Sequence, residues 1–288
     1  VNNLITISKL VPLTLFIAIG IFFINGANFT PVFPQDTYVD GSFAQAAVLL
    51  FFAYTGFEVI AIAAEDMKNP KKNLPRAIIM CMLLVSVLYM AILAVSIGVL
   101  GSDLANTKAP VQDAFNVIVG PIGMYVVLVG TLISMGGINF AEAYYAPRVA
   151  TSMAEDGMLP SALAKRNRYN APYVAAIVTA IASVLLAWSG SFTTLAAISA
   201  VSRFTQYLPT CLAVIIFRRK WADKARSYTI PGGYLIPVIA IGTSLWMLAQ
   251  AQTNQLLWGL GGCIVILPFY YSYWKKKKAG LIKDHDEM

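Results

Sequence analysis

The sequence predicts an all-α polytopic membrane protein with eight transmembrane helices, and three observations support this fold class. Of the 288 residues, 58% are hydrophobic and only 12% are charged, whereas about 25% of the residues of a typical soluble domain are charged. The mean hydropathy is +0.68. The apolar residues also gather in runs of about 20, the length that crosses the hydrocarbon layer as a helix. No stretch fits a soluble domain, so we expect a single membrane domain over residues 1–288.

The first four predicted spans are separated by clear polar breaks. The first, 5–25, contains the sequence "ISKLVPLTLFIAIGIFF". The second, 43–64, is followed by "EDMKNPKKNLPR", whose two prolines forbid a continuous helix into the third span at 77–100. The fourth, 116–146, precedes about 25 polar residues, which we expect to form short helices at the cytoplasmic surface.

The last four predicted spans are shorter or closer together. The fifth, 171–188, is the least marked, because only "SGS" separates it from the sixth at 193–217. The seventh and eighth spans are expected at 233–250 and 255–274, and residues 275–288 form a charged tail. Eight spans place both chain ends on the same side of the membrane.

The distribution of basic residues orients the spans. Eighteen of the 21 lysines and arginines fall in one alternating set of connections, and the opposite set holds only Lys108 beside four aspartates. Since basic loops stay in the cytoplasm, both chain ends are expected there, in the cell membrane. The net charge of +7 thus reflects the basic residues of the loops expected in the cytoplasm. No nucleic-acid partner is expected, because no folded basic domain is present.

Several functional classes find no support in the sequence. Cys81, Cys211 and Cys263 lie in apolar runs without ligand-like spacing, and His285 stands alone in the tail, so no metal site and no cofactor are expected. No Walker, HExxH or GxSxG motif is present, so we expect no catalytic residues and no enzyme. The chain starts at Val1 and enters an apolar run almost at once, which we interpret as a fragment whose beginning is missing.

The segment "FFAYTGFEVIAIAAEDMKNPKKNLP", residues 51–75, places Gly56 and Glu58 inside a span. Two interpretations are equally supported by composition. In one, Gly56 allows the helix to break, Thr55 bonds a freed carbonyl, and the exposed backbone lines a cavity. In the other, the helix is intact, Gly56 is a packing notch, and Glu58 is bonded to a neighbour.

Three other charged residues, Lys9, Glu142 and Arg203, lie within predicted spans, and such residues are functional candidates because they are costly in lipid. Glu142 lies near the cytoplasmic end of its span and is expected to form an interfacial salt bridge with Arg148. Lys9 either snorkels to the cytoplasmic interface, which its position favours, or takes the place of a coupling cation and releases a proton. Arg203, in "AVSRFTQYLP", has no obvious partner in the sequence and is expected to form a structural pair.

Four motifs together resemble amino acid permeases of the amino acid–polyamine–organocation superfamily. "ISKLVPLTLFIAIGIFF" is similar to their fifth span, and "FFAYTGFEVIAIAAEDMKNPKKNLPRAI" resembles their sixth span and the following loop. "RVATSMAEDGMLPSALAKRNRYNAPYVA" resembles the loop between their eighth and ninth spans, and "RSYTIPGGYLIPVIA" the entry to their eleventh. The four matches come in family order and cover essentially the whole chain.

This resemblance implies a twelve-span transporter built from two five-span inverted repeats plus two further spans. Residues 5–25 would be the last span of the first repeat, 43–217 the complete second repeat, and 233–274 the two additional spans. The family's first four spans would be missing, and with them half of the binding site.

The resemblance also implies a substrate site at the broken segment. Its unwound backbone would receive the ammonium group of the substrate, an aromatic side chain would close over it, and an acid associated in some relatives with proton sensing would lie beside it. The corresponding residues here are Phe52, Ala53, Tyr54, Thr55, Gly56 and Glu58. Glu58 leaves the cargo open, because it suits a cationic amino acid if charged and a neutral one if protonated.

Lys9 matches a fifth-span lysine that the family links to proton coupling, which favours its functional interpretation. Gly136, Gly137 and Asn139 would face that lysine from the eighth span of the family as possible ion-site or coupling neighbours. Small residues there serve equally well for close helix packing.

The function implied is secondary active transport of amino acids by alternating access, as a proton symporter or an amino acid exchanger. The partners would be the amino acid, the lipid bilayer and protons. The alternative is a membrane-embedded structural subunit or enzyme with no transport role.

Overall fold

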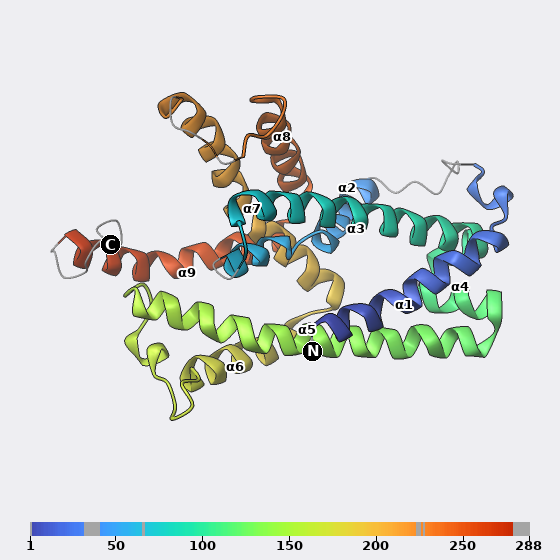
Figure 1. Cartoon of the computed structure of the whole chain (residues 1–288), viewed down its shortest axis with the longest axis horizontal. Coiled ribbons are helices and arrows are strands. Elements are labelled where there is room, and N and C mark those ends of the chain that lie inside the picture. The colour runs from blue at the N-terminus through green and yellow to red at the C-terminus, as the bar shows by residue number, and fades with distance from the viewer. Residues whose placement is uncertain (1, 32–40, 65–66, 223–225, 227, 279–288) are drawn as a thin grey trace. The chain divides into compact units, whose positions relative to one another are not determined.

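A computed structural model describes residues 2–31, 41–64, 67–222, 226 and 228–278. Throughout these residues the regular structure is entirely helical, without a strand (Figure 1). The chain divides into two compact units, one made of residues 1–39 and 79–144 and the other of residues 40–78 and 145–288. Residues 279–288 of the expected tail, which include His285, lie outside the described residues, as do residues 32–40 of the loop after the first span.

The first unit contains four α-helices or parts of them, joined by short 3-10 helices. They are α1 (Asn2–Gly20), η1 (Ile21–Phe23), η2 (Gly26–Phe29), α3 (Pro70–Leu100) from Ile79, η4 (Gly101–Asn106), α4 (Pro110–Val119) and α5 (Pro121–Glu155) as far as Tyr144.

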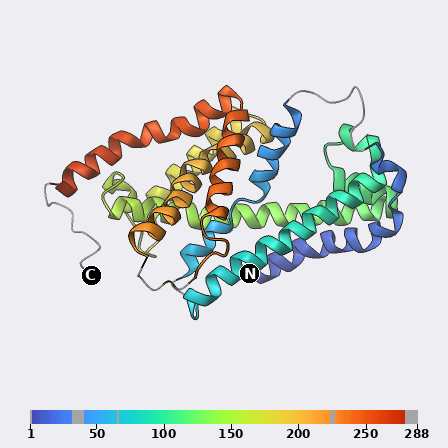
Figure 2. The same ribbon diagram turned by 90° about the horizontal axis from the view of Figure 1, so that it is seen from above.

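The second unit contains the remaining helices and is centred on α7. They are α2 (Ser42–Ala53), η3 (Phe57–Ala64), η5 (Ser161–Ala164), α6 (Tyr173–Ser189), α7 (Phe192–Lys220), α8 (Leu235–Gln250) and α9 (Thr253–Lys278), together with the start of α3 and the end of α5. α2, α8 and α9 all pack against α7, which is the yellow to orange helix beside the red α9 in Figure 2.

The helices confirm the predicted class of fold. In the described part of the chain, six helices are long and apolar enough to cross a membrane, and α6 and α8 are shorter apolar helices. Each of the eight predicted spans overlaps at least one of these helices. Many of their large apolar side chains are exposed, such as Leu83, Val87 and Met90 along α3, as a helix surrounded by lipid requires. The protein is therefore an all-α polytopic membrane protein.

The fourth predicted span, 116–146, is wrong at its start. The helix is interrupted at Gly120, which separates α4 from α5. Gly120 has φ +73°, a conformation that favours glycine. Pro121 then opens α5, where its missing N–H costs nothing. An apolar run does not reveal such a break, since neither residue is polar.

The surface loop expected after that span is only partly a loop. α5 continues to Glu155, so the start of the segment expected to form separate short helices extends the long one. Gly157, with φ +78°, follows the end of the helix. Only η5 is a short helix of the expected kind.

The core of the first unit joins four helices around Phe16. The ring of Phe16 meets Phe115 edge to face, with 5.6 Å between ring centroids. Val95, Ala114 and Val127 complete the buried cluster. This packing holds α1 against α3, α4 and α5.

Gly130→Ala is expected to destabilise the first unit. Gly130 is buried where α5 meets α1, and a Cβ there would lie 2.5 Å from Cγ of Pro12. The proline ring cannot turn aside, so the helices must separate, and overpacking of this kind costs about 1–3 kcal/mol. A lower unfolding temperature, measured in detergent by intrinsic fluorescence, would show it.

Gly136→Ala is the matched control on the same helix. An added Cβ at Gly136 meets none of the described atoms within 4 Å, and alanine is the better helix former by about 1 kcal/mol. An unfolding temperature that falls equally in both variants would contradict the packing role of Gly130.

Candidate functional site: a broken helix and a lysine pocket

The predicted discontinuity after α2 is confirmed. α2 ends at Ala53, Tyr54 to Gly56 form a turn, and η3 begins at Phe57. Thr55 donates its N–H and its hydroxyl to the carbonyl of Phe52, at 3.1 and 2.7 Å, so its side chain does bond a freed carbonyl. Gly56 has φ +104°, which only glycine adopts without strain.

Glu58 folds back onto this turn and joins it to α7. Its Oε2 accepts the N–H of Gly56 at 2.9 Å and the hydroxyl of Tyr207 at 3.1 Å. Its Oε1 is buried and pairs with the guanidinium of Arg203. The two predicted alternatives are thus both met in part: the helix is broken, and Glu58 is bonded to neighbours.

Aromatic rings enclose this network on one side. Phe51 stacks on the buried Phe204 at 4.7 Å between centroids. Tyr207 stacks on Phe57 at 6.0 Å and meets the edge of Phe51 at 5.8 Å. Tyr207 is therefore fixed with its hydroxyl toward Glu58.

The other residues predicted for the substrate site lie along the same turn. Phe52 is half-buried and packs edge to face against Phe192 of α7, at 6.1 Å between centroids. Ala53 and Gly56 are exposed, whereas Tyr54 and Thr55 are half-buried. All six predicted residues thus lie at the junction of α2 and η3.

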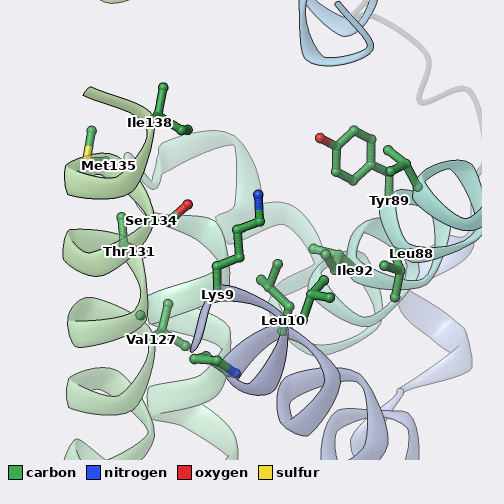
Figure 3. Close-up of a pocket in the computed structure, with 14 residues that line it drawn as sticks. Lys9, Leu10, Leu88, Tyr89, Ile92, Val127, Thr131, Ser134, Met135 and Ile138 are labelled. Carbon is green, nitrogen blue, oxygen red and sulfur yellow. The ribbon is translucent and has the colours of Figure 1, made fainter. Parts of the chain in front are cut away.

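Lys9 lines a pocket of about 340 Å³ in the first unit. Its ammonium group extends into the space between Ser134 of α5 and Tyr89 of α3 (Figure 3). The side chain of Lys9 is only half-buried. Pro12, in the next turn of α1, also lines the pocket and cannot donate a helical hydrogen bond.

The α5 residues that face Lys9 are not the predicted ones, Gly136, Gly137 and Asn139. The pocket is lined from α5 by Val127, Gly130, Thr131, Ser134, Met135 and Ile138, and Gly136, Gly137 and Asn139 are not among these residues. Each helical residue turns the chain by about 100°, which directs Gly136 away from the face that lines the pocket. Asn139 bonds instead to the carbonyl of Met135 at 3.0 Å.

The expected structural pair of Arg203 is confirmed, but sequence reasoning identified neither its partner Glu58 nor the bond from Tyr207 to the same carboxylate. A signal was present, since Arg203 and Tyr207 are four residues apart and so share a helix face, and a charge inside a span requires a partner.

Among the described residues no group of three or more His, Cys, Asp or Glu side chains could hold a metal ion.

The fold, the broken helix beside Glu58 and the Lys9 pocket define the class of protein. It is a polytopic membrane protein with a discontinuous helix and ionisable groups among its helices. The family model described as amino acid permease matches residues 1–273, and the chain belongs to this family. The sequence resemblance is thereby confirmed.

Three relatives illustrate the similarity. The chain is 29% identical over 283 residues to the branched-chain amino acid permease BcaP of Bacillus subtilis, covering 96% of this chain and 59% of the relative. It is 29% identical over 280 residues to the methylthioribose transporter of the same organism, with the same coverage. The serine/threonine exchanger SteT of B. subtilis is 29% identical over 287 residues, 97% of this chain and 65% of the relative. The chain thus spans about three fifths of the length of these relatives.

Proposed function

We propose that this chain is part of a secondary active transporter that moves amino acids across the cell membrane by alternating access. Its family supports this proposal, as do relatives named as a permease, a transporter and an exchanger. These names favour transport over the alternative of a structural subunit or membrane-embedded enzyme. The energy would come from proton symport or from exchange of one amino acid for another.

The observation that carries the proposal is the broken helix between Ala53 and Phe57. Backbone groups outside a regular helix are tolerated at membrane depth only where they face protein, water or a ligand. In this proposal, carbonyl groups of Ala53, Tyr54, Thr55 and Gly56 receive the substrate ammonium, and Phe52 closes over the bound amino acid.

Lys9 takes the role of the coupling group. A primary amine inside a pocket can exchange a proton as the protein alternates between its inward-open and outward-open states. Gly136, Gly137 and Asn139, which are absent from the lining of the Lys9 pocket, have no part in this proposal.

The orientation follows from the basic loops, with both chain ends in the cytoplasm. The direction of transport and the proton gradient are defined relative to that side. The lipid bilayer, protons and a small amino acid are therefore the partners that we propose.

Uptake into proteoliposomes tests this function. The intact gene product that contains this chain, reconstituted and tested with radiolabelled amino acids, should show saturable uptake that unlabelled amino acids inhibit. Uptake should respond to an imposed pH gradient in a symporter, or to amino acid preloaded inside in an exchanger. Failure of every standard amino acid to enter or exchange would refute the proposal.

A further inference from the structure

The charge on Glu58 decides which amino acids a site at the broken helix accepts, and the sequence leaves that charge open. A free carboxylate would attract a cationic side chain. A carboxylate already paired with a cation would not. The structure bears on this question because it assigns Glu58 a partner, Arg203, in the same unit.

We propose that the Arg203–Glu58 ion pair makes this wall of the substrate site electrically neutral, so that the transporter accepts amino acids with uncharged side chains and excludes cationic ones. Arg203 is then a residue that determines specificity without contacting the substrate. This inference rests on the proposed transport function and on the position of the site at the broken helix.

The first step of the argument is that Glu58 has little capacity left for a substrate. A carboxylate has about four acceptor sites on two oxygens. Oε2 already accepts the Gly56 N–H and the Tyr207 hydroxyl. Oε1 is buried against Arg203, so a substrate cation cannot reach it.

The second step is that the arginine charge is permanent. Guanidinium does not lose its proton in proteins, so Arg203 offsets the negative charge of Glu58 in every state that keeps the pair. Only 31% of the Arg203 side chain and 18% of the Glu58 side chain are exposed, which limits screening by water and salt.

The third step is that the pair is held in place from several sides. Tyr207, one turn further along α7, is fixed by Phe51 and Phe57 and donates to Glu58. The backbone of Gly56 donates to the same carboxylate. Glu58 is therefore held toward α7, and a cationic substrate would have to compete with Arg203 for it.

The test is a competition assay with substrates of different charge. Uptake of radiolabelled leucine or serine by the reconstituted intact gene product should be inhibited by unlabelled neutral amino acids and not by arginine or lysine. In Arg203→Gln the carboxylate loses its cation, and the inhibition constant of arginine relative to that of leucine should fall about tenfold or more, which corresponds to about 1.4 kcal/mol.

Two further variants separate charge from structure. The double variant Glu58→Gln with Arg203→Gln restores a neutral wall, so arginine should again be excluded. Arg219→Gln removes a charge from an exposed position of the same helix and should leave the preference unchanged. A merely structural role of Arg203 would lower transport of all substrates together without changing their ratio.

Each outcome decides between the two proposals. Equal inhibition of the wild type by arginine and by leucine, or an unchanged ratio in Arg203→Gln, overturns the inference and leaves the transport function standing. Absence of any amino acid uptake by the wild type overturns the function itself. Should Arg203→Gln fail to fold, Glu58→Gln serves instead: its unpaired arginine should let glutamate compete for uptake, and no gain of glutamate inhibition overturns the inference.

Discussion

Lys9→Ala is expected to abolish proton-driven accumulation of substrate while leaving the protein folded. Alanine cannot carry a proton, and among the residues that the structure describes no other lysine, arginine or carboxylate lines the Lys9 pocket, so coupling has no substitute there. The fold should survive because Lys9 is only half-buried and lies beside an open pocket rather than in the Phe16 core. The measurement is uptake into proteoliposomes with and without an inward proton gradient.

Lys108→Ala is the control for the loss of a lysine, because Lys108 is an exposed residue between η4 and α4. It should accumulate substrate as the wild type does. Undiminished, gradient-dependent accumulation by Lys9→Ala would contradict the coupling role, and an unfolding temperature far below that of the wild type would show that the residue serves the fold instead.

Much of the fold could be predicted because membrane spans appear in the sequence as long runs of apolar residues. A span needs about 20 apolar residues, and the predicted runs coincide with α1, α3 and α6 to α9 within a few residues at most ends. The break at Gly120 does not appear in the hydropathy, since glycine and proline are both compatible with an apolar run, and its sign in the sequence is the turn-favouring pair Gly120–Pro121. Its position depends on backbone conformation, which hydropathy does not measure.

The candidate site could be predicted only where local chemistry decides it. Residues adjacent in the chain made a break at Gly56 one of two equally supported alternatives, and the family resemblance favoured it. The partners of Glu58 could not be predicted in this way, because Tyr207 is 149 residues away, and only the packing of α2 and η3 on α7 brings them together. The prediction of which α5 residues face Lys9 was wrong for a related reason. Tertiary contacts set the rotation of α5 about its axis, and this rotation directs Ser134 and Ile138 toward the pocket instead of Gly136 and Asn139.

Gly56→Ala is expected to reduce transport at least tenfold by straining the turn itself. At φ +104° an added Cβ would meet no described atom within 4 Å, so the effect cannot come from a clash. It comes from the backbone, where a conformation of this kind costs a residue with a side chain about 1–3 kcal/mol. The strain is relieved if the chain rewinds toward a continuous helix, which would remove the carbonyl groups proposed to bind substrate.

Gly242→Ala separates this effect from the general consequences of replacing glycine. Gly242 lies in α8 with helical geometry, and a Cβ there is also unobstructed by the described residues, so uptake should be unchanged. The Glu58 bond to the Gly56 N–H depends on the turn, so Gly56→Ala should also loosen the neutral pair with Arg203 and lower the unfolding temperature. Normal uptake by Gly56→Ala would mean that a continuous helix transports equally well, and the broken helix would then have no part in binding.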